Sequence, residues 1–405
     1  MGHRIVVIGG GYAGVTAANR LARRIDGAEV MLVNERATFV ERVRLHQVAA
    51  GESIVVRPLR ERVRSGVSVV VDRVRGIDLD RREVALAGGG GNSAGGNGAG
   101  GGGAEGAGGG GNSAGGNGAG GGGVLRYDTL VYALGSAAAP APDAAMALAT
   151  AEDAERIRDR LVELAAERAA VAVVGGGLTG IEAASEIAER FPSLRVRMVS
   201  EVDPGPGLSP RGRRHVRAVL DRLGVEVISG SVADARDGAV RLSDGRSVGA
   251  ALTVACTGFV VPPLAAWAGL AVDEAGRVRV DRTLRSVSHP DVYAVGDAAV
   301  PDLPSGRMLR MACATALPMS GAAGAAIAAR LAGRKASGLR FRYVNQCVSL
   351  GRRDGVIQAV DADDRPHRIA LTGRSAAWYK EAVVKGALWF AAHPGPYRPV
   401  RPAAV

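Results

Sequence analysis

The feature that most constrains this chain is a glycine turn close to its start. Residues 4–8 form an apolar run rich in β-branched side chains, which suits a strand buried on both faces of a parallel sheet. A helical pattern follows the turn, and a second apolar run over residues 30–33 ends near the acidic Glu35. The turn itself contributes Gly9, Gly11 and Gly14. Strand, glycine turn, helix, strand and acid in this order predict a βαβ unit that binds a dinucleotide.

Each glycine of this turn has its own physical task. Gly9 permits the tight bend after the strand, Gly11 lets the backbone approach a pyrophosphate, and Gly14 lets the helix pack closely against the strand. The free N–H groups and the positive end of the helix dipole then face the phosphates. Glu35 can accept hydrogen bonds from a ribose diol.

A second unit of the same kind begins near residue 171. An apolar run over residues 171–174 leads into a glycine turn, a helical pattern over 181–190 and another apolar run over 194–199. The turn contributes Gly175, Gly177 and Gly180. Two such units indicate two nucleotide domains, which hold two dinucleotides or one dinucleotide beside an evolutionary relic. Glu201 after the second strand would repel a 2′-phosphate, which favours NADH over NADPH.

Two further motifs give the chain a family resemblance. Residues 129–136 read Thr-Leu-Val-Tyr-Ala-Leu-Gly-Ser, and residues 283–297 begin Thr-Leu-Arg and end Asp-Val-Tyr-Ala-Val-Gly-Asp. Together with the first glycine turn and Glu35, these segments resemble the FAD motifs of flavoproteins with the glutathione-reductase fold. The resemblance covers nearly the whole chain outside a glycine-rich tract, and three motifs in the right order are highly specific.

The cysteine spacing limits which flavoproteins of this fold group the chain resembles. Cys256, Cys313 and Cys347 are far apart in the sequence, whereas a disulfide reductase needs two thiols a few residues apart against the flavin. The chain instead resembles type II NADH:quinone oxidoreductases and the apoptosis-inducing-factor-like reductases. The segments that carry this resemblance are residues 42–47, 256–259 and 349–355. Cys256 and Cys347 could meet near the flavin, as a cysteine pair does in sulfide:quinone reductases, but we expect them to be buried structural residues.

The resemblance implies an α/β fold with two Rossmann-like dinucleotide-binding domains and a small C-terminal α+β region. The NAD domain is expected to be inserted in the FAD domain. The expected boundaries are 1–142 and 272–335 for the two parts of the FAD domain, 143–271 for the NAD(P)H domain and 336–405 for the C-terminal region. Within the first part, residues 88–123 are mostly glycine, have almost nothing to bury and predict a disordered insert.

The resemblance also implies cofactor contacts at particular residues. The N–H groups of Tyr12 and Ala13 would face the FAD pyrophosphate, and Val74 would contact the adenine through its backbone. A helix starting near Ala316 would direct its positive end at the flavin. Arg44 would contact an FAD phosphate or the flavin edge, with a solvated basic face as the alternative. Further cofactor contacts are expected at Gly135, Gly258, Gly296 and Asp297, of which the aspartate would bind the ribityl chain.

Glu182 is the expected catalytic residue. In the resembling quinone reductases an acid at this position lies near the flavin and the nicotinamide, where it could orient the nicotinamide or relay a proton. The alternative is structural, because Glu182, Ser185, Glu186 and Glu189 form one polar helix row and an acid in a first turn suits the helix dipole. His46 could deliver a proton at the flavin, although a lone histidine beside a basic loop is more often incidental.

The charge and hydropathy of the chain limit its partners. The formal net charge of +11 is spread along the sequence without a basic block, so nucleic-acid binding is not expected. The wide spacing of the three cysteines predicts neither a disulfide framework nor a metal site, and it suggests a cytoplasmic protein. No run has the hydrophobicity of a membrane span and only three residues precede the first strand, so we expect neither a transmembrane helix nor a signal peptide. Residues 375–390 predict a basic, aromatic helix, which would rest on the inner face of the membrane, cover the flavin domain or form a homodimer interface.

These observations predict an FAD-dependent enzyme that accepts hydride from NADH and passes two electrons to a quinone-type acceptor. Two alternatives stay open. The first is an NADH-dependent reductase of ferredoxin or of another small electron-carrier protein. The second is a redox sensor that binds FAD and NADH with little turnover.

Overall fold

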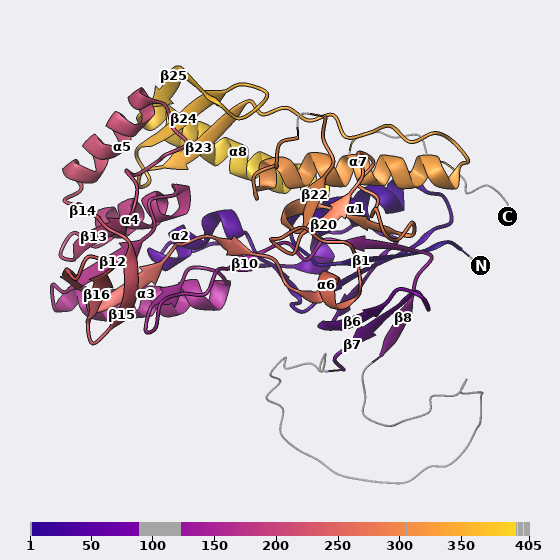
Figure 1. Cartoon of the computed structure of the whole chain (residues 1–405), viewed down its shortest axis with the longest axis horizontal. Coiled ribbons are helices and arrows are strands. Elements are labelled where there is room, and N and C mark those ends of the chain that lie inside the picture. Colours follow the sequence, from indigo (N-terminus) through magenta and orange to yellow (C-terminus); the bar gives the residue numbers. More distant parts are fainter. Residues whose placement is uncertain (1, 89–122, 305, 394, 396–399, 401–405) are drawn as a thin grey trace, which may run out of the picture.

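Two parallel sheets form the cores of two lobes, which lie side by side in Figure 1. The computed structural model describes residues 2–88, 123–304, 306–393, 395 and 400. The first sheet has the strand order β21-β9-β1-β2-β5, with all neighbours parallel. Its strands are β1 (Arg4–Ile8), β2 (Glu29–Asn34), β5 (Val67–Val71), β9 (Thr129–Tyr132) and β21 (Val292–Ala294). Residues 5–8 are fully buried, as expected for a β-branched run inside a parallel sheet.

Helices and a small antiparallel sheet complete the first lobe. Helices α1 (Tyr12–Arg24) and α7 (Cys313–Leu331) pack against each other and contribute to the same apolar core as the sheet. The antiparallel sheet consists of β6 (Val74–Asp78), β7 (Glu83–Leu86) and β8 (Val124–Arg126). The predicted insert leaves after β7 and returns before β8, and its residues 89–122 lie outside the described part of the chain. The Leu86 N–H donates to the Gly123 carbonyl at 2.9 Å, so the chain leaves and returns at one place.

The second lobe is inserted between β9 and β21. Its parallel sheet has the order β11-β18-β12-β13-β14. The strands are β11 (Met146–Ala147), β12 (Ala170–Val174), β13 (Arg195–Ser200), β14 (Glu226–Ser229) and β18 (Leu252–Ala255). Helices α3 (Ala151–Ala166), α4 (Leu178–Arg190) and α5 (Pro210–Arg222) belong to it, as does an antiparallel sheet of β15 (Val232–Arg236), β16 (Ala239–Leu242) and β17 (Ser247–Gly249). This arrangement confirms the predicted α/β class with two Rossmann-like units.

The C-terminal region joins the two lobes. Its antiparallel sheet, β23 (Asn345–Ser349), β24 (Gly355–Val360) and β25 (Pro366–Thr372), packs on α4 and α5. Helix α8 (Arg374–Ala392) then runs from this sheet to α1 and α7 (Figure 1). Val356 accordingly belongs to the apolar core of the second lobe, whereas Ala387 and Ala391 belong to that of the first. The C-terminal region therefore packs against both lobes and lies beside the space between them.

Two crossing segments connect the lobes. Strand β10 (Ala137–Ala138) leads into the second lobe, and β19 (Phe259–Val260) leads back and pairs with it in antiparallel orientation. The shorter elements are β3 (Thr38–Phe39), β4 (Arg57–Pro58), β20 (Val278–Val280), β22 (Ala299–Pro301), α2 (Leu45–Ala49) and α6 (Leu264–Trp267). Within the described ranges, no helix combines the length and the hydropathy that crossing a bilayer requires.

Candidate functional site

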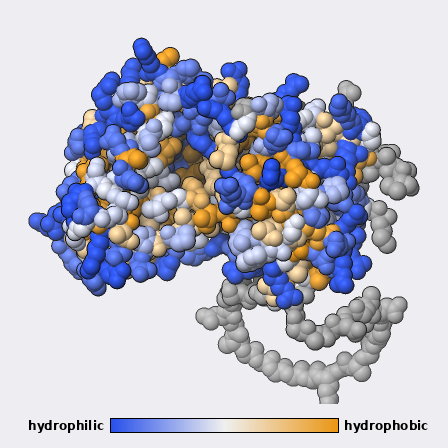
Figure 2. Space-filling view, in the orientation of Figure 1, coloured by the Kyte–Doolittle hydropathy of each residue, from blue (hydrophilic) through white to orange (hydrophobic). Residues whose placement is uncertain are grey.

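One continuous cavity of about 1890 Å³ lies between the lobes and reaches both glycine turns. The space-filling view shows the surface hollowed between the two halves, with apolar residues around the hollow (Figure 2). Pockets for a single small ligand usually measure roughly 300–1,000 Å³, so this cavity has room for two large ligands. Of the residues predicted from the sequence, the lining includes Gly9, Gly11, Tyr12, Ala13, Glu35, Val74, Gly135, Gly175, Gly177, Glu182, Glu201, Gly258, Gly296, Asp297 and Ala316.

The first glycine turn is shaped by three different steric demands. Gly9 has a φ of +104°, and a Cβ there would overlap the Ala133 carbonyl. A Cβ on Gly14 would overlap the Gly9 carbonyl, so Gly14 is required for packing α1 on β1 and does not line the cavity. A Cβ on Gly11 would meet no protein atom within 4 Å. Gly11 therefore leaves space that a ligand, and not the protein, can fill.

The second glycine turn repeats this geometry. Gly175 has a φ of +121°, and a Cβ there would overlap the Cys256 carbonyl, while a Cβ on Gly180 would overlap the Gly175 carbonyl. Gly177 again faces open space. Gly11 (φ −78°, ψ −169°) and Gly177 (φ −73°, ψ 176°) also begin α1 and α4 with nearly the same backbone. The two turns are thus equivalent cradles for two dinucleotides.

The ends of the cavity carry the other predicted nucleotide contacts. Tyr12 and Ala13 occupy the first turn of α1, where N–H groups have no helical acceptor. Glu35 follows β2, lines the cavity and forms ion pairs with Arg36 and Arg73 at 2.9 and 3.3 Å. Glu201 follows β13 in the corresponding place. The cavity therefore runs from one acidic strand end, past both helix N-termini, to the other.

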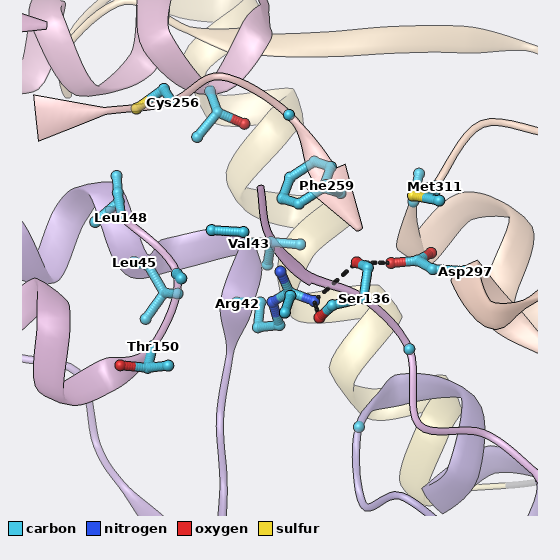
Figure 3. A pocket seen from close by; sticks show the side chains of 18 of the residues that line it. Arg42, Val43, Leu45, Ser136, Leu148, Thr150, Cys256, Phe259, Asp297 and Met311 are labelled. Carbon is cyan, nitrogen blue, oxygen red and sulfur yellow. Dashed lines mark hydrogen bonds between the residues drawn. The ribbon is translucent and has the colours of Figure 1, made fainter. Parts of the chain in front are cut away.

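Figure 3 shows a short hydrogen-bond chain among residues that line the cavity. Arg42 donates to the Ser136 carbonyl at 2.6 Å, and the Ser136 hydroxyl donates to the Asp297 carboxylate at 2.7 Å. Asp297 follows Gly296, whose φ of +73° turns the chain toward the cavity. This hydrogen-bond chain holds the Asp297 carboxylate in the cavity lining. Sequence reasoning missed Arg42 and Ser136, although both lie inside motifs that it used.

The structure gives Arg44 a different role from the predicted cofactor contact. Its buried guanidinium pairs with Glu41 at 3.1 Å and with Glu381 at 2.8 Å, and it does not line the cavity. Residues 42–44 form a 3-10 helix, so the side chains of Arg42 and Arg44 point about 120° apart around its axis. Arg42 therefore faces the cavity, while Arg44 ties this segment to α8.

The start of α7 also differs from the prediction. The helix begins at Cys313, and the Ala316 N–H already donates to the Ala312 carbonyl at 3.0 Å. The free amides at the positive end of this helix are consequently those of Cys313 and Ala314, which both line the cavity. Ala316 borders the cavity without offering its N–H group.

A buried polar cluster, formed by Glu182, Lys380, Ser349 and His46, occupies the cavity floor. The Lys380 ammonium forms an ion pair with Glu182, and it donates to the Ser349 hydroxyl at 3.1 Å. Glu182 also accepts from the Ser349 backbone N–H at 3.1 Å and lies 3.6 Å from His46 Nδ1. Glu182, Lys380 and His46 line the cavity. The cluster thus places a carboxylate, an ammonium and an imidazole against any ligand that reaches it.

Two expectations about this cluster change with the structure. Helix α4 begins at Leu178 and has no acid in its first turn, so Glu182 does not lie at the helix N-terminus as predicted. Lys380, which the sequence assigned to the basic surface of the last helix, is instead buried on the side of α8 that faces the cavity. The pairing with Lys380, and not the helix dipole, stabilises the ionised Glu182.

Protonation in the cluster follows from burial and charge. Burial raises the pKa of Glu182, but Lys380 and the other donors outweigh it and bring the pKa below its ordinary value. Burial lowers the pKa of His46 to about 4; Glu182 opposes this shift, and the positive charges of Lys380, Arg352 and Arg44 add to it. At neutral pH the cluster therefore combines an ionised Glu182 with a neutral His46.

We expect His46 to make the fold sensitive to acid. Between pH 6.5 and about 4 the unfolded chain protonates this side chain and the folded chain does not, so stability is lost as pH falls through this window. Above pH 6.5 His46 is neutral in both the folded and the unfolded state, so none of this stability is lost there. Melting temperatures of the FAD-loaded protein against pH should fall less steeply in His46→Gln. Identical slopes in the two proteins would refute the assignment.

The state of the cysteines and the lack of a metal-ligand cluster among the described residues limit which reactions the site can support. All three cysteines are free and line the cavity. Burial raises the pKa of Cys256 to about 12 and that of Cys347 to about 11, and it also raises the pKa of Cys313. Thiolate, the reactive form, is therefore scarce at neutral pH. Among the described residues, no group of three or more His, Cys, Asp or Glu side chains could hold a metal ion.

Comparisons with known proteins agree with this geometry. Residues 3–318 match the family model described as pyridine nucleotide-disulphide oxidoreductase. An NADH dehydrogenase-like protein of Mycobacterium tuberculosis is 31% identical over 384 residues, with 87% of each chain covered. The type II NADH:quinone oxidoreductase Ndh of the same organism is 28% identical over 332 residues, covering 75% of this chain and 68% of its own. The structure of NDH2 from Plasmodium falciparum in complex with NADH superposes with a TM-score of 0.74 at 14% identity, covering 97% and 98% of the two chains.

Proposed function

Because this chain belongs to the pyridine nucleotide-disulphide oxidoreductase family, we propose that it is an NADH-dependent FAD oxidoreductase whose second acceptor is a quinone. It uses FAD and NADH, and the two equivalent glycine cradles fit these two dinucleotides. FAD is assigned to the first cradle, because Asp297 and the free amides of α7 belong to the same lobe. When bound, FAD accepts hydride from NADH and delivers two electrons to the second acceptor.

The residues of this chain orient the partners and control charge. Gly11 and Gly177 leave room for the two pyrophosphates beside the amides of α1 and α4. Asp297, held by Ser136 and Arg42, can accept hydrogen bonds from a sugar-alcohol chain. The amides at the start of α7 favour negative charge in the cavity. Glu182 and Lys380 then supply the polar contacts where the two halves of the cavity meet.

The observation that carries the quinone proposal is the chemistry of the cavity floor. Lys380 can donate a hydrogen bond to a carbonyl oxygen of a planar acceptor, and Glu182 can exchange a proton with it. Apolar side chains also line this cavity, among them Met311 just before α7 and Val383 and Val384, which lie one helical turn after Lys380 on α8. The elevated thiol pKa values speak against disulfide chemistry at the same place. The names of the mycobacterial and cyanobacterial relatives, an NADH:quinone oxidoreductase and a demethylphylloquinone reductase, support the same acceptor.

Steady-state NADH oxidation by the FAD-loaded protein tests the acceptor. We expect turnover with menadione or ubiquinone, and little with a ferredoxin. Fast ferredoxin reduction without quinone turnover would favour the carrier-protein alternative. Binding of both cofactors without turnover on any of these acceptors would favour the sensor.

Helix α8 also supports peripheral contact with a membrane, where quinones reside. On the side of α8 away from the cavity, Trp378 and Trp389 lie about three turns apart and are 75% and 55% exposed. Lys385 lies on the same face, where its charge would meet anionic headgroups.

We expect the double variant Trp378→Ser, Trp389→Ser to reduce co-sedimentation with anionic vesicles severalfold. Trp267→Ser is the matched control, because this residue is 77% exposed on the short helix α6 and does not belong to α8. Equal binding by the two variants would contradict a specific role for α8.

A further inference from the structure

Glu186 is a buried acid that the proposed chemistry leaves without a task. It lies on α4 one turn after Glu182, is 2% exposed and does not line the cavity. Its Oε1 atom is buried and has no hydrogen-bond partner among the described residues. An unsatisfied buried carboxyl oxygen is costly, and such groups tend to serve a function.

The surroundings of Glu186 connect the solvent with the cavity floor. On its outer side, Arg352 Nη1 lies 3.9 Å from Glu186 Oε1, and the Arg352 side chain is 38% exposed. On its inner side, His46 Nε2 lies 3.9 Å from the same oxygen and 3.3 Å from the Ser349 hydroxyl. The opposite ring nitrogen, Nδ1, lies 3.6 Å from Glu182 Oε2, which borders the cavity. One imidazole therefore stands between a carboxyl reached from outside and a carboxylate facing the ligand.

Quinone reduction needs a proton that NADH does not provide. Converting a quinone to a quinol takes two electrons and two protons, whereas a hydride brings two electrons and one proton. The second proton must come from solvent in every turnover. FAD and NADH would fill much of the cavity and displace water from it, so a defined route for this proton is an advantage.

Resting on the quinone function proposed above, we propose that Glu186 and His46 form a relay that carries this proton from the Arg352 edge to Glu182. The O–H bond of protonated Glu186 breaks as an N–H bond forms on His46 Nε2. The N–H bond on His46 Nδ1 breaks as an O–H bond forms on Glu182, which passes the proton to the quinone oxygen. Glu186 then recovers a proton from solvent, and a ring flip or tautomerisation of His46 returns its proton from Nε2 to Nδ1 before the next turnover. Separations of 3.6 and 3.9 Å are closed to hydrogen-bond distance by a small side-chain movement.

The charges around Glu186 suit this task. They are Glu182 and Glu189 on α4, His46 on α2, Arg352 in the β23–β24 turn and Lys380 on α8. Burial raises the pKa of Glu186 to about 7; Arg352 opposes this shift, and Glu189 adds to it. An acid with a pKa near the working pH both holds and releases a proton readily. The low pKa of His46 keeps the imidazole neutral between transfers.

The test compares two acceptors in Glu186→Gln, which keeps the shape of the side chain and removes its proton exchange. Menadione takes up protons on reduction and ferricyanide does not. We expect menadione reduction to fall by about tenfold at about pH 8 and less at about pH 6, where protons are more abundant. Ferricyanide reduction, FAD content and melting temperature should stay at wild-type values. Glu155→Gln, on the exposed face of α3, is the control for loss of one negative charge.

A second readout does not depend on turnover. Infrared spectra of the FAD-loaded protein should show a carboxylic-acid carbonyl band that titrates near neutral pH and is missing in Glu186→Gln. Absence of this band in the wild type, or equal losses with both acceptors, would overturn the relay. Unchanged menadione reduction in the variant would do the same while leaving the quinone function intact. Wild-type protein that reduces ferricyanide but never menadione would instead overturn the quinone function and the relay with it.

Discussion

Gly11→Val is expected to yield a folded protein that no longer binds FAD. The valine Cβ would meet no protein atom within 4 Å, and the backbone at Gly11 (φ −78°, ψ −169°) suits any residue. The side chain would instead project into the cavity beside the N–H groups of Tyr12 and Ala13, where the pyrophosphate must approach. The bound flavin should fall from about one per chain to nearly none, as the visible absorbance of the purified protein will report.

Gly177→Val is the matched control for this prediction. Gly177 starts α4 in the same conformation and faces the same kind of open space, but in the second lobe. This variant should keep its flavin and lose NADH-dependent bleaching of the flavin absorbance. Dithionite should still reduce the flavin, which separates lost NADH binding from a damaged flavin site. Flavin loss in both variants, or in neither, would contradict the assignment of the two cradles.

Separating the buried partners Glu182 and Lys380 is expected to produce the largest loss of stability. Their side chains are 12% and 10% exposed, and removing one partner of a buried ion pair leaves an uncompensated charge. We expect Glu182→Gln and Lys380→Met each to lower the free energy of unfolding by about 3 kcal/mol. The double variant should recover most of this loss, because it leaves no buried charge unpaired. Chemical denaturation of the FAD-loaded proteins measures all three values.

The same variants separate stability from function. Quinone turnover should fall by roughly a hundredfold in Glu182→Gln and should not recover in the double variant, because the proton-exchanging carboxyl is still missing.

Glu152→Gln is the control for the stability measurement, because Arg36 and Glu152 form an exposed pair, with side chains 35% and 59% exposed. This variant should lower the free energy of unfolding by less than about 1 kcal/mol. A double variant as unstable as the sum of the single variants would show that the pair does not act as a unit.

The fold could be predicted because its signals are local. The turn at Gly9 and the turn at Gly175 each specify a strand end, a bend and a helix start within a few residues, and the structure shows both with nearly equal dihedral angles. The same holds for the turn at Gly296, which places Asp297 in the cavity lining. These positions depend on steric limits of the backbone, which are the same in every chain.

The direction of a side chain on a helical segment was harder to predict. Arg42 and Arg44 are equally basic and two residues apart, yet only Arg42 faces the cavity. Lys380 looked like part of a basic surface, yet it is buried against Glu182. In both cases the rotation of the segment is set by its packing partners, Glu381 on α8 and the β23–β24 sheet under α8. Periodicity alone does not include those partners.

The sequence by itself therefore determined the two nucleotide-binding units, their order along the chain and the lack of two cysteines a few residues apart. Only the tertiary structure decided which polar groups meet on the cavity floor. His46, Glu182, Ser349 and Lys380 come from four elements, and Ser349 and His46 are 303 residues apart. Their contact depends on how the C-terminal sheet and α8 pack across both lobes. Such long-range packing follows from the shapes of completed domains, which no local run of residues specifies.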